Sequence, residues 1–496
     1  MFGKDNSQLS SGFSNKHAGG TNYLRNTVRT SVFSGDPVIE GKLTKAQLYW
    51  KYYNNIHWKE NNDTLLSFNY CRAIIDKVNN FIIGKEGFEN SIVDLYGDEI
   101  DEEVEAAFEA LLDYNWRKNK KKTILQKILQ MGAICGDTYL FLYPNVDAGF
   151  VEYIVLDSRT VIPMFKDGNY NIIDGYKVIK LLGKNEQEYI QKVTEYTKNA
   201  TTTYYIKATG SQQDRFQLTE NLHKYGIIPI VHIENIPMSD EYGGKSDLED
   251  IIKLNKVYNE MAEDVKMIID YYAQPITVIT GGTVGQLKRG LNQIWSGLPS
   301  DASVFNLSLG EDLGASTEYL KLLKNAMHDL SGVPEEILSK VQHISNTSAA
   351  ALSMMYQPII QIADKKSVSY GEGIAELHRL TGIVYARSIS DHPLFAKLPS
   401  SAKVPDNTNK FFDRIMALPV WKYNLPNDRQ AMLMEIDIEL RNKIASKREV
   451  MERLGKKNIP KILNEIASDT QEKVEELAKI ASIEKAQEPN TPPTDA

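Results

Sequence analysis

The chain has 496 residues, of which 57 are basic and 65 acidic, and its formal net charge is −8 at pH 7. This acidic balance excludes a polycation that coats nucleic acid by counterion release. The two cysteines, Cys71 and Cys135, are too few for a disulfide scaffold or a four-cysteine zinc site, so we expect a reduced intracellular setting. The sequence contains no apolar run long enough to span a membrane and no secretory signal.

The N-terminal part begins with a polar segment, and helical patterns follow it. Residues 1–42 are rich in Gly, Ser, Asn and Thr, a composition that predicts a disordered arm. Helical periodicity then recurs in four segments, 43–53, 64–83, 101–116 and 123–134. Gly84 lies where the second of these helices would end. We therefore expect a layer of helices at the start of the folded part.

Gly136-Asp137 marks a change from helical to strand-like patterns. Short β-branched and aromatic runs occur at 138–143, 151–156, 172–182, 188–196, 202–206 and 215–219. Turn signals such as Asp167-Gly168-Asn169 separate several of these runs. Helices followed by a meandering sheet predict an α+β fold, and the whole chain remains mainly helical.

The stretch from Gly226 to Gly282 divides the chain into two parts of different character. An apolar run at 227–233 predicts a buried strand, and Ser246 with Glu249 predicts a capping box for a helix from Asp247 to Ala273. A narrow apolar stripe on this helix suits packing against another long helix. The stripe residues proposed for this packing are Leu254, Tyr258, Met261, Val265 and Ile268.

The segments after this helix alternate between short strands and helices. We expect strands at 275–280 and 303–307, with a short helix at 284–295 between them, and then a helix at 317–330. Residues 336–347 fit neither period. A long helix is predicted at 348–387, with a kink near Pro358. After a proline-containing segment at 391–427, charged helical patterns occur at 428–441, 447–454 and 459–483.

Several short motifs together resemble the portal proteins of tailed double-stranded DNA bacteriophages, in particular those of the siphovirus type that connect head to tail. The motifs are Glu234-Asn235, Gly244-Lys245-Ser246-Asp247-Leu248-Glu249, Tyr258-Asn259, Ala273-Gln274-Pro275-Ile276 and Gly281-Gly282. Each motif is short, so the order of the elements over residues 43–480 carries more weight than any one of them.

The resemblance implies a portal fold with wing, stem, clip and crown. It divides the chain into an arm (1–42), wing (43–246), stem helix (247–273), clip (274–316), returning stem helix (317–338), tunnel loop (339–347), kinked helix with wing return (348–427), helical crown (428–483) and disordered tail (484–496).

By the same resemblance, the protein would form a dodecameric ring at one capsid vertex, through which genomic DNA is packaged and ejected. It would be assembled in the host cytoplasm and become part of the virion. The implied partners are double-stranded DNA, contacted weakly and without sequence preference, the packaging terminase, the major capsid and scaffolding proteins, and the head-completion or adaptor proteins. No enzyme activity, cofactor, metal or membrane contact is implied.

Two groups of residues are singled out by their place in the implied fold. The tunnel loop would offer Lys340, Gln342, His343, Ser345 and Asn346 to DNA. A lone loop histidine such as His343 is more often simply solvated. The clip would offer Lys288, Arg289 and Trp295 to the motor and head-completion proteins. A core position for Trp295 remains an equal alternative.

Two other classes of function remain open. Residues Gly244-Lys245-Ser246 lie between a strand and a helix, as a phosphate-binding loop does, which would suit a DNA-processing nucleotidase or nuclease. Ser239 replaces the first glycine of that motif, and Asp240 and Glu241 place negative charge where phosphate would bind. The other alternative is a helical scaffold protein without DNA contact, which would be a monomer or small oligomer.

Overall fold

The structure is a computed structural model. It describes residues 36–56, 67–85, 87–95, 102–182, 189–209, 212–223, 225–239, 242–273, 277–281, 301–306, 313–335, 349–388, 411–412, 414–423, 436–454, 459–464, 466–468 and 471. The chain divides into two compact units. The first comprises residues 1–345 and 354–425, and the second comprises residues 346–353 and 426–496. Within the described residues the fold is a mixture of helices and strands, as predicted.

The four N-terminal helices are α4 (Pro37–Tyr53), α5 (Tyr70–Ile83), α6 (Glu102–Lys118) and α7 (Lys121–Cys135). Helix α4 starts earlier than the expected residue 43 because Asp36 caps it, accepting a hydrogen bond from the Val38 amide at 2.9 Å. Helix α5 starts later than the expected residue 64, at a cap formed by Asn69. Gly84 ends α5 with a positive φ of 57°, as the sequence predicted.

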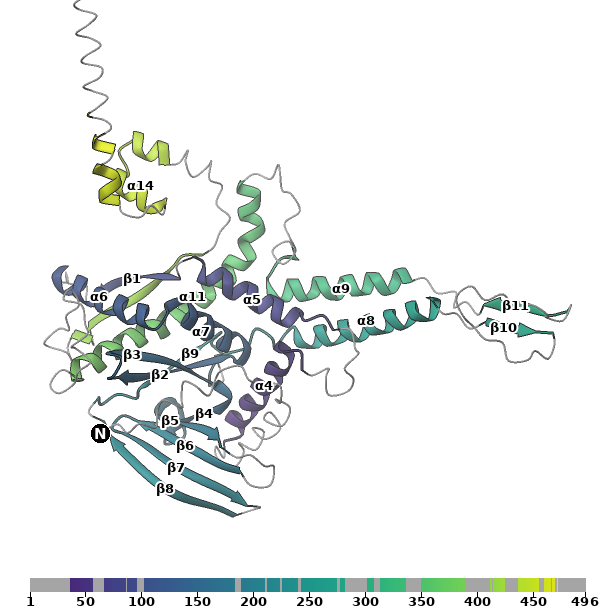
Figure 1. Cartoon of the computed structure of the whole chain (residues 1–496), viewed down its shortest axis with the longest axis horizontal. Coiled ribbons are helices and arrows are strands. Elements are labelled where there is room, and N and C mark those ends of the chain that lie inside the picture. The colour runs from purple at the N-terminus through teal and green to yellow at the C-terminus, as the bar shows by residue number, and fades with distance from the viewer. Residues whose placement is uncertain are drawn as a thin grey trace, which may run out of the picture. The chain divides into compact units, whose positions relative to one another are not determined.

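A three-stranded sheet lies against these helices in the order β3-β2-β9 (Figure 1). Its strands are β2 (Asp137–Asn145), β3 (Phe150–Leu156) and β9 (Ile230–Glu234). The outer edge of β3 is covered by Asn115 and Asn119 of α6 and the turn after it. The Asn115 side chain exchanges two 3.0 Å hydrogen bonds with the Val151 backbone, and the Tyr153 amide donates to Asn119 Oδ1 at 2.8 Å. This edge is therefore closed within the chain.

A second sheet has five antiparallel strands in the order β4-β5-β6-β7-β8. The strands are β4 (Val161–Lys166), β5 (Asn169–Leu181), β6 (Tyr189–Thr197), β7 (Ala200–Thr209) and β8 (Gln212–Leu222). A 3₁₀ turn, η3 (Ser158–Thr160), precedes β4. Strand β4 was not predicted, because Pro163 weakens its pattern, but it lies at the sheet edge, where a proline is tolerated. One face of this sheet packs on Ile39 and Leu43 of α4.

A two-stranded sheet joins distant parts of the chain. Strand β1 (Phe88–Asp94) pairs antiparallel with β12 (Ile415–Trp421). Strand β1 was not predicted from the sequence, and residues 391–427 were expected only to return to the wing. Neither segment shows a long run of alternating residues, and their pairing depends on a partner more than 300 residues away along the chain.

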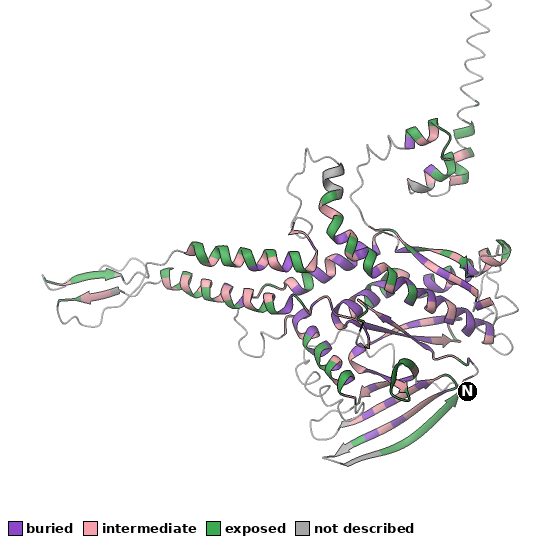
Figure 2. Ribbon diagram, turned by 180° about the vertical axis from the view of Figure 1, so that it is seen from behind, coloured by how far each residue is buried: buried purple, intermediate pink, exposed green. Residues whose placement is uncertain are grey.

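Two helices, α8 (Ile252–Ala273) and α9 (Leu313–Ser331), lie side by side in Figures 1 and 2. Between them in the chain, β10 (Thr277–Thr280) pairs antiparallel with β11 (Ser303–Asn306), close to the two strands expected there. The helix expected at 284–295 lies outside the described residues. We call α8 and α9 together the two-helix arm.

The longest helix is α11 (Ala349–Ser388), with Pro358 inside it, within one residue of the range expected from the sequence. The main core of the first unit is built around α5, α7 and α11 (purple in Figure 2). Its largest buried side chains include Trp116, Tyr153, Tyr370 and Tyr385.

In the second unit, the helix α14 (Lys447–Arg453) closely matches the predicted 447–454. Ser446 and Glu449 form a capping box at its start. The Glu449 amide donates to Ser446 Oγ at 3.1 Å, and the Ser446 amide donates to the Glu449 carboxylate at 3.4 Å. Residues 436–441 and 459–464 are also helical. The predicted helices at 428–441 and 459–483 are therefore described only in part.

Candidate functional site

The corner between β9 and α8 is organised around one buried asparagine. Asn235 is fully buried, and its amide nitrogen donates to Lys245 O at 3.0 Å and to Asp247 Oδ1 at 2.7 Å. Its side-chain oxygen accepts from the Tyr370 hydroxyl at 2.8 Å. One side chain therefore fixes the loop at Lys245, the turn at Asp247 and helix α11 with respect to each other.

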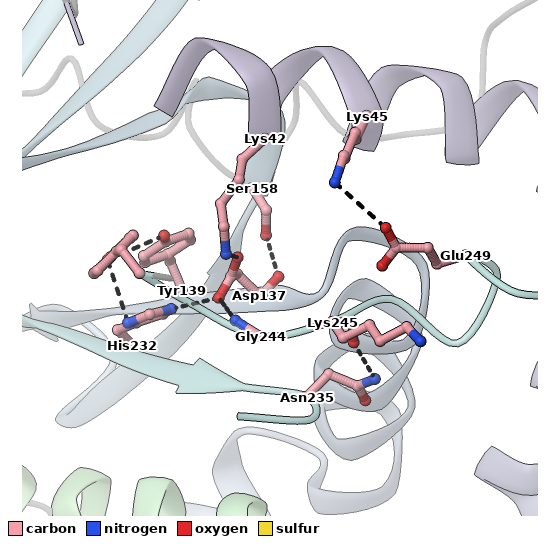
Figure 3. A network of polar contacts seen from close by, with 11 residues as sticks. Lys42, Lys45, Asp137, Tyr139, Ser158, His232, Asn235, Gly244, Lys245 and Glu249 are labelled. Atoms are coloured by element: carbon pink, nitrogen blue, oxygen red, sulfur yellow. Dashed lines mark hydrogen bonds and ion pairs between the residues drawn. The ribbon is translucent and has the colours of Figure 1, made fainter. Parts of the chain in front are cut away.

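Asp137, the first residue of β2, binds the other side of this loop. Its Oδ1 atom accepts from the Gly244 amide at 2.8 Å and lies 2.8 Å from His232 Nε2, while Lys42 Nζ lies 3.7 Å from Oδ2 (Figure 3). The His232 ring stacks on Tyr139, with ring centroids 4.6 Å apart. The Asp137 carboxylate is only 6% exposed, so these contacts offset the cost of its burial.

This geometry does not suit the phosphate-binding alternative. The Gly244 amide, which would have to donate to a phosphate, already donates to the chain's own Asp137 carboxylate. Lys245 Nζ donates to Asp250 at 2.7 Å. Ser246 is buried, and its hydroxyl donates toward the carbonyl oxygens of Ala133 and Ile134, at 3.0 and 2.7 Å. The three residues therefore hold the loop in place, and a bound nucleotide would have to displace all of these contacts.

The predicted capping box at Ser246 and Glu249 is wrong. Ser246 Oγ accepts from the Leu248 amide at 3.1 Å, but the Glu249 carboxylate pairs with Lys45 of α4 at 3.3 Å (Figure 3). Residues 247–251 form turns, and α8 begins at Ile252 instead of Asp247. The tertiary contacts of Ser246 and Asp247 hold this segment in a conformation that local propensity alone would have made helical.

Helix α11 contacts the same corner through side chains three and four residues apart, those of Lys366, Ser369 and Tyr370. The ammonium group of Lys366, 1% exposed, pairs with the Asp247 carboxylate, and the Ser369 hydroxyl donates to Glu234 O. A side chain at Gly373 would overlap the Ile233 side chain. The sequence did not single out Lys366, because a lysine within a helix usually faces water.

Two asparagines of α8, one turn apart, bind the segment before α5. The Phe68 amide donates to Asn259 Oδ1 at 2.6 Å, and Asn259 Nδ2 donates to Phe68 O at 3.1 Å. The Tyr70 amide donates to Asn255 Oδ1 at 3.2 Å. Asn259 belonged to one of the portal-like motifs, but its role was not predicted. Two asparagines at i and i+4 within an apolar stripe are the signal that could have revealed it.

The stem stripe predicted from the sequence lies beside the most buried face of α8. The most buried side chains of the helix are Ile252, Asn255, Asn259 and Ala262. The predicted residues Leu254, Tyr258, Met261, Val265 and Ile268 are all intermediate in exposure. Tyr258 contacts the rings of Phe68 and Tyr70, with centroids 5.6 and 5.2 Å apart. The role of the stripe in stem packing therefore stays a prediction.

Many residues on the outer part of the two-helix arm are exposed (green in Figure 2), and several of them are large and apolar. On α8 no residue after Ala262 is buried as far as Tyr272, and Met267 and Ile269 are 55% and 51% exposed. On α9 Tyr319 and Leu322 are 42% and 61% exposed. Exposed apolar residues on two adjacent helices are typical of a surface that another protein covers.

The other predicted site residues cannot be placed. The tunnel-loop residues Lys340, Gln342, His343, Ser345 and Asn346 lie outside the described residues. The same is true of the clip residues Lys288, Arg289 and Trp295.

His378, in the C-terminal half of α11, is a structural histidine. It is fully buried, its Nε2 atom accepts from Trp116 Nε1 at 2.8 Å, and its Nδ1 atom donates to Ala417 O at 2.9 Å. Burial lowers the pKa of His378 to about 4, so the ring is neutral at pH 7.

Among the described residues, no group of three or more His, Cys, Asp or Glu is placed to hold a metal ion. None of the helices in that same part of the chain is long and apolar enough to cross a bilayer.

Two chains from solved structures are similar to this chain. A chain from a structure titled "Virion of native gene transfer agent (GTA) particle" is 14% identical, with a TM-score of 0.37, over 77% of this chain and 88% of that one. A chain from "Neck of empty GTA particle computed with C6 symmetry" is 14% identical, with a TM-score of 0.39, over 77% and 89%. No curated protein sequence matches.

A family profile gives a far broader match than any single motif. The profile described as "Phage portal protein, SPP1 Gp6-like" matches residues 40–489, which is most of the 496-residue chain. The match includes the corner between β9 and α8, the two-helix arm and α11. The chain therefore belongs to the phage portal protein family, of the SPP1 Gp6-like type.

Proposed function

We propose that this protein forms a closed ring, a dodecamer in the virion, around a channel through which genomic DNA is packaged and later ejected. As a phage portal protein, the chain is a structural component of the virion and acts at a capsid vertex. The observation that carries the ring is the two-helix arm, whose outer apolar surface has no cover within the described part of the chain. Adjacent copies in a ring would cover it.

The charge of the chain suits a channel wall that lets DNA slide. A subunit with a net charge of −8 has no strong overall attraction for phosphates, so DNA can pass without being held. The tunnel-loop residues, among them Lys340, Gln342 and His343, would supply light contacts to the DNA backbone. This assignment rests on the portal family and on the sequence.

The partners follow from the portal role and the domain division proposed from the sequence. The clip (274–316), with Lys288, Arg289 and Trp295, would dock the terminase motor during packaging and the head-completion or adaptor proteins afterwards. The wing and the crown would contact the major capsid and scaffolding proteins. The force for packaging would come from the terminase, so the protein itself is proposed to be non-enzymatic.

Native mass spectrometry and electron micrographs of the purified full-length chain test the ring. We expect perforated rings for the wild-type protein and loss of rings for Leu254→Asp and Val265→Asp, which place charge on the predicted stem stripe. Solitary, unperforated particles of the wild-type protein at every concentration would contradict the proposal. Rings from both variants would contradict the stem role of the stripe.

The channel and the enzyme alternative need separate experiments. Deletion of residues 342–345 should leave rings intact and impair DNA packaging, and normal packaging by such rings would disprove the loop assignment.

For the enzyme alternative, purified rings should hydrolyse no ATP and cut no DNA in the presence of magnesium. Turnover that Lys245→Ala abolishes would support the nucleotidase or nuclease instead.

A further inference from the structure

A groove of about 260 Å³ lies between the two sheets of the first unit. One wall consists of residues from β2 and β3, including Phe141 and Ile154, and the other is one face of the five-stranded sheet. The opposite face of that sheet is covered by α4. None of the contacts of the β9–α8 corner involves this groove, so it is a separate feature of the fold.

Two lysines lie side by side on the wall of this groove that the five-stranded sheet forms. Lys180 of β5 and Lys192 of β6 are directly paired in the antiparallel register, and both line the groove. Like charges in such a pair repel and destabilise a sheet. Neither ammonium group has an ion-pair partner within the described residues, and no carboxylate is among the groove's lining side chains that the structure describes. The nearby ion pair of Lys177 with Glu195 lies on the opposite face, at alternate positions of the same strands.

The lysine pair belongs to a row of side chains that crosses four strands. Lys192 is paired with Tyr205, and Tyr205 with Phe216, whose rings stack with centroids 5.8 Å apart. Thr194 and Thr203 form the next row, with their hydroxyl oxygens 3.4 Å apart. The groove therefore combines cations, hydroxyl groups and aromatic surface.

The far end of the groove offers a hydrogen-bond acceptor. His223 Nε2 lies 3.1 Å from Thr197 O, and since a carbonyl oxygen can only accept, Nε2 carries the proton. Its Nδ1 atom is then an acceptor, is buried, and has no hydrogen-bond partner within the described residues. Burial also lowers the pKa of His223 below its usual value, which keeps the ring neutral. A ligand with an N–H group would satisfy this nitrogen.

The distance between the lysine pair and His223 sets the length of a ligand that could contact both. Lys192 and Thr197, the residue whose carbonyl oxygen binds His223, are five residues apart along β6, which is about 16 Å in an extended strand. The same length holds about five residues of an extended peptide.

We propose that this groove binds an extended acidic peptide segment of a partner protein, with its carboxylates on Lys180 and Lys192 and a backbone N–H group on His223. Charge complementarity carries the choice of occupant, because the groove presents two unneutralised cations beside apolar and aromatic walls. A nucleic-acid strand would also bring anions, but the groove's small volume and apolar floor suit aliphatic side chains better than a sugar–phosphate backbone. The proposal does not depend on ring formation.

Fluorescence anisotropy of a short labelled peptide that alternates glutamate and leucine tests the site on the full-length chain. We expect saturable binding that weakens with salt and no binding of the matched lysine–leucine peptide. Lys180→Glu and Lys192→Glu should each weaken binding at least about tenfold. The matched control is Lys198→Glu, an exposed lysine in the turn between β6 and β7 of the same sheet, which should bind as the wild type does.

A second variant separates binding from folding. Lys192→Met removes one of two opposed like charges, so we expect its melting temperature to stay the same or rise while peptide affinity falls about tenfold. A lysine with only a structural role would lower the melting temperature when removed. Equal binding by Lys192→Glu and Lys198→Glu, tighter binding of a labelled single-stranded oligonucleotide than of the peptide, or no peptide binding at all would overturn the proposal.

Discussion

The corner between β9 and α8 and the outer part of the two-helix arm are connected by α8, yet they differ in how far their side chains are buried by other parts of the chain. At the corner, Asp137, Asn235 and Lys366 are buried and bound to partners from several elements. Along the outer arm, Met267 and Leu322 are more than half exposed. The contacts of the corner form within a single chain, whereas in the proposed ring a neighbouring copy would cover the outer arm. Substitutions at the corner should therefore act on folding, and substitutions on the outer arm should act on assembly.

The largest effect is expected at the buried ion pair. Lys366→Met leaves the Asp247 carboxylate without its cation, which should lower the free energy of unfolding by about 3–5 kcal/mol. Chemical denaturation measures the change. Its control is Lys365→Met, one residue earlier on the exposed side of α11, which should change stability by no more than about 0.5 kcal/mol. Equal losses from both variants would mean that the corner does not depend on this pair.

The free energy of unfolding, measured as a function of pH, should show the contribution of the neutral His378 ring. Its pKa is about 4 in the folded chain and about 6.5 when unfolded, so the unfolded state binds the proton more readily. The stability contributed by the neutral ring is complete above pH 6.5 and is lost as the pH falls toward 4, by up to about 3 kcal/mol.

Comparison of wild type with His378→Gln isolates this contribution. The variant should lose the part of the pH dependence that lies between pH 6.5 and 4. An unchanged slope in the variant would show that other groups cause the pH dependence.

A smaller effect is expected where two glycines approach each other at the corner. Gly136 has a φ of 88°, and a side chain there would overlap the Gly244 carbonyl oxygen. Gly136→Ala should therefore lower the free energy of unfolding by about 1–3 kcal/mol. Gly41→Ala, in α4, meets no atom within 4 Å and should instead stabilise the chain by about 0.5–1 kcal/mol. Thermal unfolding of both variants measures this difference in sign, and a stabilised Gly136→Ala chain would disprove the close approach.

The smallest effect on folding, and the largest on assembly, is expected on α9. Leu322 is 61% exposed, whereas its neighbour Leu323 is 6% exposed. Leu322→Glu should leave the stability of the isolated chain within about 0.5 kcal/mol of wild type but prevent ring formation. Leu323→Ala should cost about 2–4 kcal/mol of stability. Native mass spectrometry and denaturation together distinguish the two, and intact rings from Leu322→Glu would show that the exposed face is not an interface.

The sequence by itself determined the types and order of most elements. Helical spacing predicted α7, α9 and α11, short β-branched and aromatic runs predicted most strands of the two larger sheets, and Gly84 and Gly136 marked where helices end. These features are local, because the residues that set periodicity and capping lie within a few positions of each other.

Only the tertiary structure decided which residues hold these elements together. The pairing of β1 with β12, the ion pair of Lys366 with Asp247 and the bonds of Asn259 to the segment before α5 join residues far apart in the chain. The tertiary contacts of Ser246 and Asp247 likewise place the start of α8 at Ile252 instead of Asp247. Local periodicity shows that one face of a helix is apolar, but the identity of a buried polar residue's partner depends on segments that meet only after the chain has folded.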